Sequence, residues 1–287
     1  MLLKGQGVLI TGGSLGIGKS VADACVQAGA SVLICGRHAD SVAEAEADLK
    51  GIASPDQLVL GRVSDVADPE AVSEMVKAAI THLEAFSGVV NCAGITGPAG
   101  PVETNDVEEW ISTIHTNLIG TMLVSRAVIP HFRKIGHGKI VNFSGGGATS
   151  PRPRFSAYSA SKAAVVRLTE TLAYELNDTK IFVNAVAPGA VNTRMLEDVL
   201  KAGPTLVGKE DYQRAVRQKS EGGASPMEAA QLCVTLLSAE GDGISGRLIS
   251  AVWDPWRTLV SFKARLHGTD IYTLRRIVPK DRGLDWN

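Results

Sequence analysis

The sequence has few aromatic residues, almost no net charge and no long hydrophobic run. Aromatic side chains account for 5% of the 287 residues, and the formal net charge is −1. A near-neutral chain lacks the field that attracts phosphate backbones, so we expect no nucleic-acid partner. No stretch approaches the roughly 18 apolar residues of a membrane span, and the first motif comes too early for a signal peptide to precede it. We therefore expect a cytoplasmic protein that does not associate with membranes.

Cysteine is also scarce, and its spacing matches no metal-binding motif. Cys25, Cys35, Cys92 and Cys233 lie far apart in the sequence. Structural zinc sites place pairs of cysteines close together in the chain. We interpret the four as buried small hydrophobic residues in a reducing compartment, and we expect no metal.

What the sequence does contain is a regular alternation of short apolar runs and longer helical segments. The β-branched runs cover residues 7–11, 31–35, 58–63, 88–91, 138–144 and 181–188. The helix-length segments between them cover residues 16–29, 39–50, 68–83, 106–134 and 156–177. Runs that are apolar throughout are typical of strands buried on both faces. The alternation predicts an α/β protein with a parallel sheet between two helical layers.

The domain organisation follows from where this alternation stops. Residues 1–252 contain no linker and are predicted to form a single domain. Residues 190–226 are less regular, and we expect them to form a lid over a site. Residues 253–287 contain three of the four tryptophans and are basic. We expect this C-terminal extension to dock on the domain or on a neighbouring subunit.

A glycine-rich turn connects the first predicted strand to the first predicted helix. The stretch "TGGSLGIG" covers residues 11–18. In this context glycines let the backbone approach a diphosphate, and the helix N-terminus offers free N–H groups. Glycine turns also join strands to helices for packing alone. A dinucleotide cofactor is the favoured interpretation.

Arg37 follows Gly18 by 19 residues, at the end of the second predicted strand. An acidic residue near this position would bind the ribose 2′-hydroxyl of NAD, whereas an arginine suits the 2′-phosphate of NADP. The sequence therefore favours NADP(H), with NAD(H) possible. The alternatives for Arg37 are a solvated side chain, or one stacked on adenine in an NAD enzyme.

Tyr158 and Lys162 are four residues apart on a predicted helix, so their side chains share one face. A neighbouring ammonium group favours the phenolate, so it would lower the tyrosine pKa. Such a tyrosine can give a proton to a carbonyl oxygen or take one from an alcohol. On its own this spacing is common by chance and most often marks a surface.

Taken together, these motifs resemble those of the classical short-chain dehydrogenase/reductase family over residues 5 to about 252. They occur in family order as "TGGSLGIG" (11–18), "SDV" (64–66), "NCAG" (91–94), "TNLIG" (116–120), "GKIVNFS" (138–144), "YSASK" (158–162) and "VAPGAVNT" (186–193). The resemblance implies a single-domain, three-layer fold with a Rossmann-like doubly wound parallel sheet. It also implies a homodimer or homotetramer that pairs through the helices predicted at 106–134 and 156–177.

The resemblance further implies a role for each matching residue. Tyr158 would be the catalytic acid/base, Lys162 would bind the nicotinamide ribose and tune Tyr158, and the backbone at Asn117 would hold a relay water. The implied cofactor-binding residues, besides Tyr158, Lys162 and Arg37, are Gly12, Ser14, Leu15, Gly16, Ile17, Gly18, Asp65, Val66, Asn91, Ala93, Gly94, Pro188, Gly189, Val191 and Thr193.

The chain departs from the family pattern at several positions. Cys92 replaces a usual asparagine, and Leu15 replaces an arginine often found in NADP-type turns. The family's catalytic serine lies thirteen residues before the tyrosine, where this chain has Gly145. Three interpretations are open: a bulge turns Ser144 inward, glycine N–H groups near Gly145 polarise the substrate oxygen, or the site has lost its full chemistry. Ser144 is the best single candidate.

The predicted entrance for substrate lies between this strand end and Tyr158. Arg152 and Arg154 flank Pro153 there, and two arginines would suit an anionic substrate. The alternative is solvated charges, or pairing with Glu103 or Asp106. The candidate substrate residues are Gly145, Gly146, Arg152, Arg154 and Met195.

The leading hypothesis is an NADP(H)-dependent oxidoreductase that interconverts a ketone and a secondary alcohol. Two alternatives remain open at this point. The chain could be a cofactor-binding sensor or oligomer partner with weak catalysis, or a redox-neutral epimerase or dehydratase.

Overall fold

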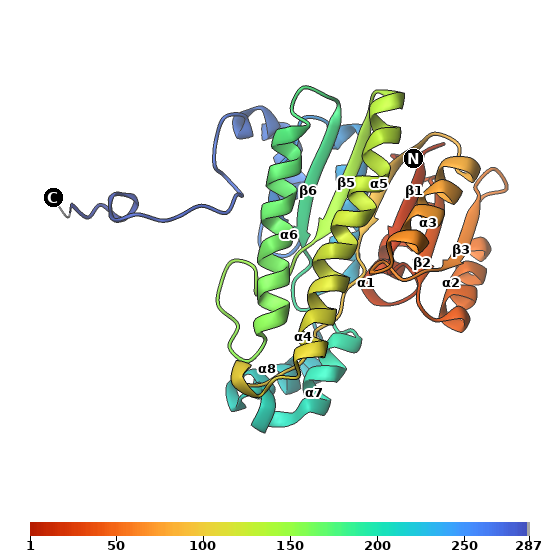
Figure 1. Cartoon of the computed structure of the whole chain (residues 1–287). Coiled ribbons are helices and arrows are strands. Elements are labelled where there is room, and N and C mark those ends of the chain that lie inside the picture. The colour runs from red at the N-terminus through yellow and green to blue at the C-terminus, as the bar shows by residue number, and fades with distance from the viewer. Residues whose placement is uncertain (286–287) are drawn as a thin grey trace.

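The six apolar runs of the sequence and one further short strand form a seven-stranded parallel sheet in the computed structural model, which describes residues 1–285 (Figure 1). The strand order is β3-β2-β1-β4-β5-β6-β7. The strands are β1 (Gly7–Thr11), β2 (Ser31–Gly36), β3 (Val59–Val63), β4 (Phe86–Asn91), β5 (Gly138–Phe143), β6 (Ile181–Ala187) and β7 (Leu248–Ser250). The prediction of a Rossmann-like doubly wound sheet in a single three-layer domain is confirmed.

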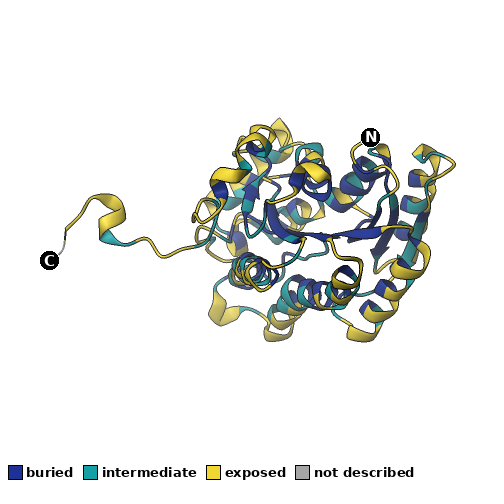
Figure 2. Ribbon diagram, turned by 90° about the horizontal axis from the view of Figure 1, so that it is seen from above, coloured by how far each residue is buried: buried dark blue, intermediate teal, exposed yellow. Residues whose placement is uncertain are grey.

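Helices cover both faces of the sheet, because each strand buries side chains in both directions. In β1, Val8 and Ile10 join one apolar cluster, whereas Leu9 joins another on the opposite face. The first cluster contains residues of α1, α2 and α9, and the second contains residues of α3, α5 and α6. Figure 2 shows the sheet as a buried layer between them.

The helices within the described residues begin and end as follows: α1 (Gly16–Gln27), α2 (Ala39–Ile52), α3 (Pro69–His82), α4 (Val107–Ile114), α5 (Gly120–Ile135), α6 (Ser156–Glu175), α7 (Arg194–Val207), α8 (Lys209–Glu221), α9 (Pro226–Leu237) and α10 (Trp256–Phe262). Helix α3 begins at an Asp-Pro pair, and the Asp68 carboxylate accepts a hydrogen bond of 2.9 Å from Glu70 N. None of these helices is both long and apolar enough to cross a membrane.

The segment predicted as one helix over 106–134 is interrupted in the middle. A π-helical turn, η2 (His115–Ile119), separates α4 from α5. The wider turn holds Asn117, whose side chain bonds to a neighbouring loop and not to its own helix. Such π turns within α-helices are often found at functional sites.

Helices α7 and α8 lie next to α4 at the lower end of the molecule in Figure 1. Gly203 has a φ of 77° and kinks α7 just before Pro204. This pair of helices fills most of the segment that the sequence analysis expects to be a lid.

The C-terminal segment has two parts of different character. Trp256, Leu259 and Leu266 belong to the core cluster that also contains α1 and α9. The buried Arg247 donates hydrogen bonds to the carbonyls of Thr269 and Ile271, at 2.9 and 2.6 Å, and so ties this part to β7. From about residue 275 the chain leaves the body as an arm (Figure 1).

Candidate active site

The glycine-rich turn after β1 adopts the conformation that close approach to a ligand requires. Gly12 and Gly16 have φ values of 65° and 55°, in the region that favours glycine. A Cβ at Gly18 would lie 2.1 Å from the carbonyl oxygen of Gly12, so the turn can close only with glycine there. Helix α1 begins at Gly16 without a side-chain cap. Its first N–H groups can therefore serve a diphosphate.

A cavity of about 680 Å³ opens above this turn. It lies at the carboxyl ends of β1, β2 and β4, where the strand order reverses, as is typical of dinucleotide sites in such sheets. The predicted residues that line it are Gly12, Ser14, Leu15, Gly16, Ile17, Gly18, Arg37, Asp65, Val66, Ala93, Gly94, Thr193 and Met195. The glycine cradle, the helix N-terminus and the cavity fit a nicotinamide dinucleotide.

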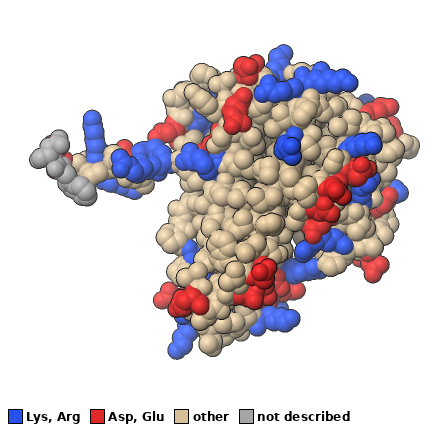
Figure 3. Space-filling view, viewed as in Figure 1, with Lys and Arg blue, Asp and Glu red and all other residues tan. Residues whose placement is uncertain are grey.

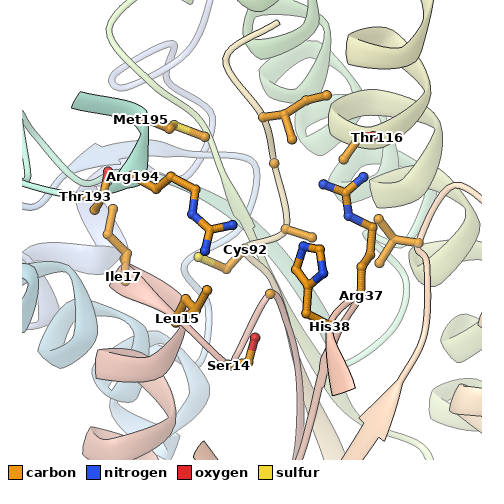
Figure 4. A pocket seen from close by; sticks show the side chains of 18 of the residues that line it. Ser14, Leu15, Ile17, Arg37, His38, Cys92, Thr116, Thr193, Arg194 and Met195 are labelled. Carbon is orange, nitrogen blue, oxygen red and sulfur yellow. The ribbon is translucent and has the colours of Figure 1, made fainter. Parts of the chain in front are cut away.

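The cavity wall also contains basic side chains that were not among the predicted site residues. Arg194, His38 and Lys219 line it together with Arg37. Figure 4 shows Arg194 entering from the side opposite Arg37 and His38. Arg194 directly follows Thr193 at the start of α7, and this adjacency is the signal that could have indicated it.

The loop after β6 brings the start of α7 onto the glycine-rich turn. A Cβ at Gly16 would lie 3.5 Å from Thr193 Cγ2. Pro188, Gly189 and Val191 belong to the same loop but are not part of the cavity wall. Gly189 has a φ of 82°, and Val191 forms a bridge with Ala224. These residues position the Thr193 segment.

Tyr158 and Lys162 are both buried on α6, with 8% and 4% of their surfaces exposed. Lys162 Nζ donates a hydrogen bond of 2.9 Å to Phe143 O and lies 5.9 Å from the centre of the Tyr158 ring. It also lies 3.4 Å from where a Cβ of Gly94, a cavity residue, would be. Tyr158 belongs to an apolar cluster with Leu196, another residue of the cavity wall. Neither Tyr158 nor Lys162 lines the cavity itself, so the pair lies beside its wall.

The electrostatics of this pair are dominated by burial. Burial lowers the pKa of Lys162 to about 8. Burial raises the pKa of Tyr158, and the cation that opposes this rise is Arg152. The sequence predicts a Tyr158 pKa lowered by Lys162, whereas in the structure burial raises it and Arg152 is the cation that opposes the rise.

Gly145 is in direct contact with the hydroxyl of Tyr158. A Cβ at position 145 would lie 2.3 Å from Tyr158 Oη, so no side chain fits there unless the tyrosine moves. The position that carries the family's serine is thus filled by the tyrosine hydroxyl itself. A Cβ at Gly146 would meet open space.

Ser144 is buried, and its hydroxyl faces the backbone of α6. Its Oγ lies 3.5 Å from Lys162 O, and its backbone N–H donates to Val186 O at 2.9 Å. It is not part of the cavity wall.

Asn117 holds the chain segment that follows β4, and Asn91 connects β4 to the neighbouring strand. Asn117 Oδ1 accepts from Ile95 N at 2.8 Å, while Nδ2 donates to Ile95 O at 2.9 Å and to Ser161 Oγ at 3.0 Å. Asn91 Nδ2 donates to Asn142 Oδ1 at 2.9 Å, which connects β4 to β5. These bonds fasten the cavity wall to the sheet and to α6.

The two arginines of the entrance loop have different surroundings. Arg154 has a φ of 67°, and its Nη1 donates to the carbonyls of Thr205 and Leu206 at 2.9 and 3.1 Å, near the end of α7. Arg152 is half-buried, and its ion pair is with Asp211 of α8. The pairing with Glu103 or Asp106 considered in the sequence analysis is therefore replaced by contacts with α7 and α8.

The four cysteines are free. Cys25, Cys35 and Cys233 are buried, and Cys92 is half-buried in the cavity wall. Burial raises the pKa of Cys25, Cys35 and Cys92 to about 12. Burial likewise raises the pKa of Cys233 well above its ordinary value.

Comparisons with known proteins agree with this geometry. A family model described as short chain dehydrogenase matches residues 6–203. A 3-oxoacyl-[acyl-carrier-protein] reductase of Thermotoga maritima is 34% identical over 253 residues, covering 87% of this chain and 97% of the relative. A variant of actinorhodin polyketide ketoreductase, crystallised with NADPH, is 27% identical with a TM-score of 0.77, covering 85% of this chain and 95% of that one.

A short-chain type dehydrogenase/reductase from Mycobacterium ulcerans is 27% identical with a TM-score of 0.78. It covers 97% of this chain, and the whole of that chain is matched. The glycine cradle, the adjoining Tyr158–Lys162 pair and these matches show that the chain belongs to the short-chain dehydrogenase/reductase family.

Proposed function

We propose that the protein is an NADP(H)-dependent, cytoplasmic oxidoreductase that interconverts a ketone and a secondary alcohol. The observation that carries this proposal is the buried Tyr158–Lys162 pair against the wall of a cavity with a glycine cradle. The relatives named for 3-oxoacyl reduction and for ketoreduction support the same class of reaction. The NADPH in the ketoreductase crystal supports the cofactor preference.

In this mechanism the chain binds the cofactor through groups of opposite charge and through backbone donors. The N–H groups at the start of α1 bind the diphosphate, and Arg37 pairs with the 2′-phosphate. Lys162 binds the nicotinamide ribose. The bound nicotinamide supplies or accepts the hydride.

Tyr158 handles the proton. Its raised pKa keeps the hydroxyl protonated at neutral pH, so it can donate to the carbonyl oxygen during reduction. The ammonium of Lys162 and the guanidinium of Arg152 then stabilise the phenolate. Because Gly145 carries no hydroxyl, the substrate oxygen is held by Tyr158 and by a second donor, either a glycine N–H group or Ser144.

The test compares wild type with Tyr158→Phe in a screen of ketones and alcohols with NADPH and NADH. We expect kcat to fall by at least about 10²-fold, while the Kd for NADPH changes by less than about threefold. Arg37→Gln should lower the NADPH-over-NADH preference by about 10- to 100-fold. Turnover that does not depend on Tyr158 would refute the mechanism, and unchanged cofactor selectivity would refute the role of Arg37.

We also propose that the chain forms a homodimer or homotetramer. Helices α5 and α6 lie side by side on one face of the molecule (Figure 1), as the helices of such an interface would. The arm beyond residue 275 is proposed to dock on a neighbouring subunit.

A further inference from the structure

Arg152 lies beside the proposed proton donor, on the loop between β5 and α6. Its guanidinium carbon is 4.0 Å from the centre of the Phe155 ring and 5.8 Å from the centre of the Tyr158 ring. The two rings belong to the apolar cluster that also contains Leu196 and Val199 of α7. The charge is therefore held at an apolar wall that includes the Tyr158 ring.

This guanidinium is only weakly paired. Its ion pair joins Nε to Asp211 Oδ2 at 3.9 Å, which is too long for a hydrogen bond. Asp211 also pairs with Arg214 at 3.2 Å. Among the described residues we find no hydrogen bond from any Arg152 N–H group. One-third of this side chain is exposed, so its N–H groups are open to solvent and to an anionic ligand.

Arg154, two residues away, has a guanidinium group that is already hydrogen-bonded. Its Nη1 donates to two backbone carbonyls of α7, so its charge is already used to hold the loop against the helix. It therefore provides a matched control on the same loop. Of the two arginines, only Arg152 contacts the Tyr158 ring.

Because position 145 carries no hydroxyl, another group has to hold the substrate beside Tyr158. With a Cβ excluded by Tyr158 Oη, no serine at position 145 can hold the substrate beside the tyrosine. A guanidinium presents a planar set of donors that matches a carboxylate in two parallel hydrogen bonds. Such a pair would fix the substrate next to the Tyr158 hydroxyl.

We propose that Arg152 binds a carboxylate of the substrate, so that the preferred substrates are keto acids and the corresponding hydroxy acids. This inference rests on the proposed function, because it assigns the substrate class of the same site. Asp211 holds the guanidinium in place until the carboxylate of the substrate binds.

A second cavity is lined by charged residues that are mainly acidic, so it would select cationic and not anionic substrates. It has a volume of about 900 Å³ between α4 and α7 and is lined by Glu108, Glu109, Asp198 and Lys201, among others. Three carboxylates against one ammonium would favour a cationic group. If this cavity selected the substrate, amino ketones would be preferred over keto acids.

The experiment measures NADPH oxidation by the full-length enzyme with matched pairs: 2-oxobutanoate, acetoacetate and levulinate, each against its methyl ester. For at least one pair we expect the acid to exceed the ester by at least about tenfold in kcat/KM. Arg152→Gln should raise KM for the acid by about 10- to 100-fold and change KM for the ester by less than about threefold. Arg152→Lys should bind the acid better than Arg152→Gln does. Arg154→Gln should keep the preference of the wild type for the acid over the ester.

A binding measurement separates recognition from catalysis. Butanoate should inhibit the wild type competitively and better than butanamide, and Arg152→Gln should abolish that difference. The Kd for NADPH and the circular dichroism spectrum verify that each variant is folded. If Arg152→Gln does not fold, the role of Arg152 in carboxylate binding is tested instead with the KM of Arg152→Lys for the acids and with butanoate inhibition of the wild type.

The outcomes separate a failure of the proposed oxidoreductase function from a failure of the role assigned to Arg152. If the wild type reduces none of these carbonyl compounds, or reduces them without Tyr158, the proposed function fails and the substrate class fails with it. If esters or amino ketones are reduced through Tyr158 with no preference for acids, only the role of Arg152 is overturned. Equal acid preference in wild type and Arg152→Gln overturns it as well.

Discussion

Lys162 illustrates how a residue with a role in the proposed reaction can oppose folding. The ammonium is buried on α6, and burial lowers its pKa from the ordinary 10.5 to about 8. Between those two pH values the unfolded chain binds more protons than the native one, so stability rises with pH. Below about pH 8 both states are protonated, and the native state carries the full cost of the buried charge.

We therefore predict a pH-dependent difference between wild type and Lys162→Met. From pH 8 to pH 10.5 the free energy of unfolding of the wild type should rise relative to the variant by about 1–3 kcal/mol. Urea unfolding of both proteins without cofactor measures it. A difference that stays constant over this range would contradict the burial of an ionisable amine at this position.

Gly145 marks the limit of what could be predicted residue by residue. The sequence indicates that a serine is missing, because the position is fixed by counting back from Tyr158. It does not indicate that the hydroxyl of Tyr158 occupies that space, since this depends on packing between β5 and α6. The same holds for Arg152 and Arg154, which look equivalent in sequence but contact different helices.

At the scale of elements, the buried strands were predictable because short apolar runs rich in β-branched residues, separated by helix-length segments, are typical of a parallel sheet. Strand β7 was not, because three residues are too short to show a pattern. The Ser225-Pro226 start of α9 is a recognisable signal, and the Ser225 hydroxyl does accept from Met227 N at 3.2 Å. The π turn around Asn117 depends on tertiary bonds to Ile95 and has no sequence signature.

Helices α7 and α8 are expected to respond to cofactor binding. The start of α7 contacts the glycine-rich turn, and Arg194, Met195 and Lys219 line the cavity. We predict that NADPH at 100-fold excess over its Kd slows amide exchange across 194–221 by up to about 100-fold. Hydrogen–deuterium exchange with mass spectrometry measures it, with α3 as the unaffected reference. Equal exchange with and without NADPH would show that this pair of helices is no lid.

At the scale of the whole molecule, the arm contrasts with the compact body. Figure 3 shows both charge signs interspersed on one face of the body, while basic side chains predominate on the arm. Ile277 and Leu284 of the arm are 58% and 51% exposed. Apolar side chains on a projecting segment are typical of contacts with another chain.

We predict that deleting residues 275–287 lowers the oligomeric state without unfolding the protomer. Residues up to Ile271 stay bound through Arg247, and Leu274 N donates to Glu170 Oε1 at 2.6 Å. Light scattering coupled to size-exclusion chromatography should give a smaller assembly, with an unchanged circular dichroism spectrum. An unaltered mass, or a monomeric wild type, would refute the docking of the arm on a neighbouring subunit.

The suppressed acidity of all four native thiols has a practical consequence. At neutral pH almost none of them is present as thiolate, the form that reacts with maleimides and similar reagents. A single cysteine introduced at an exposed position, for instance on the arm or on α8, can therefore carry a fluorophore or spin label in the otherwise native sequence. Distances between α8 and the body then become measurable in solution without first removing the natural cysteines.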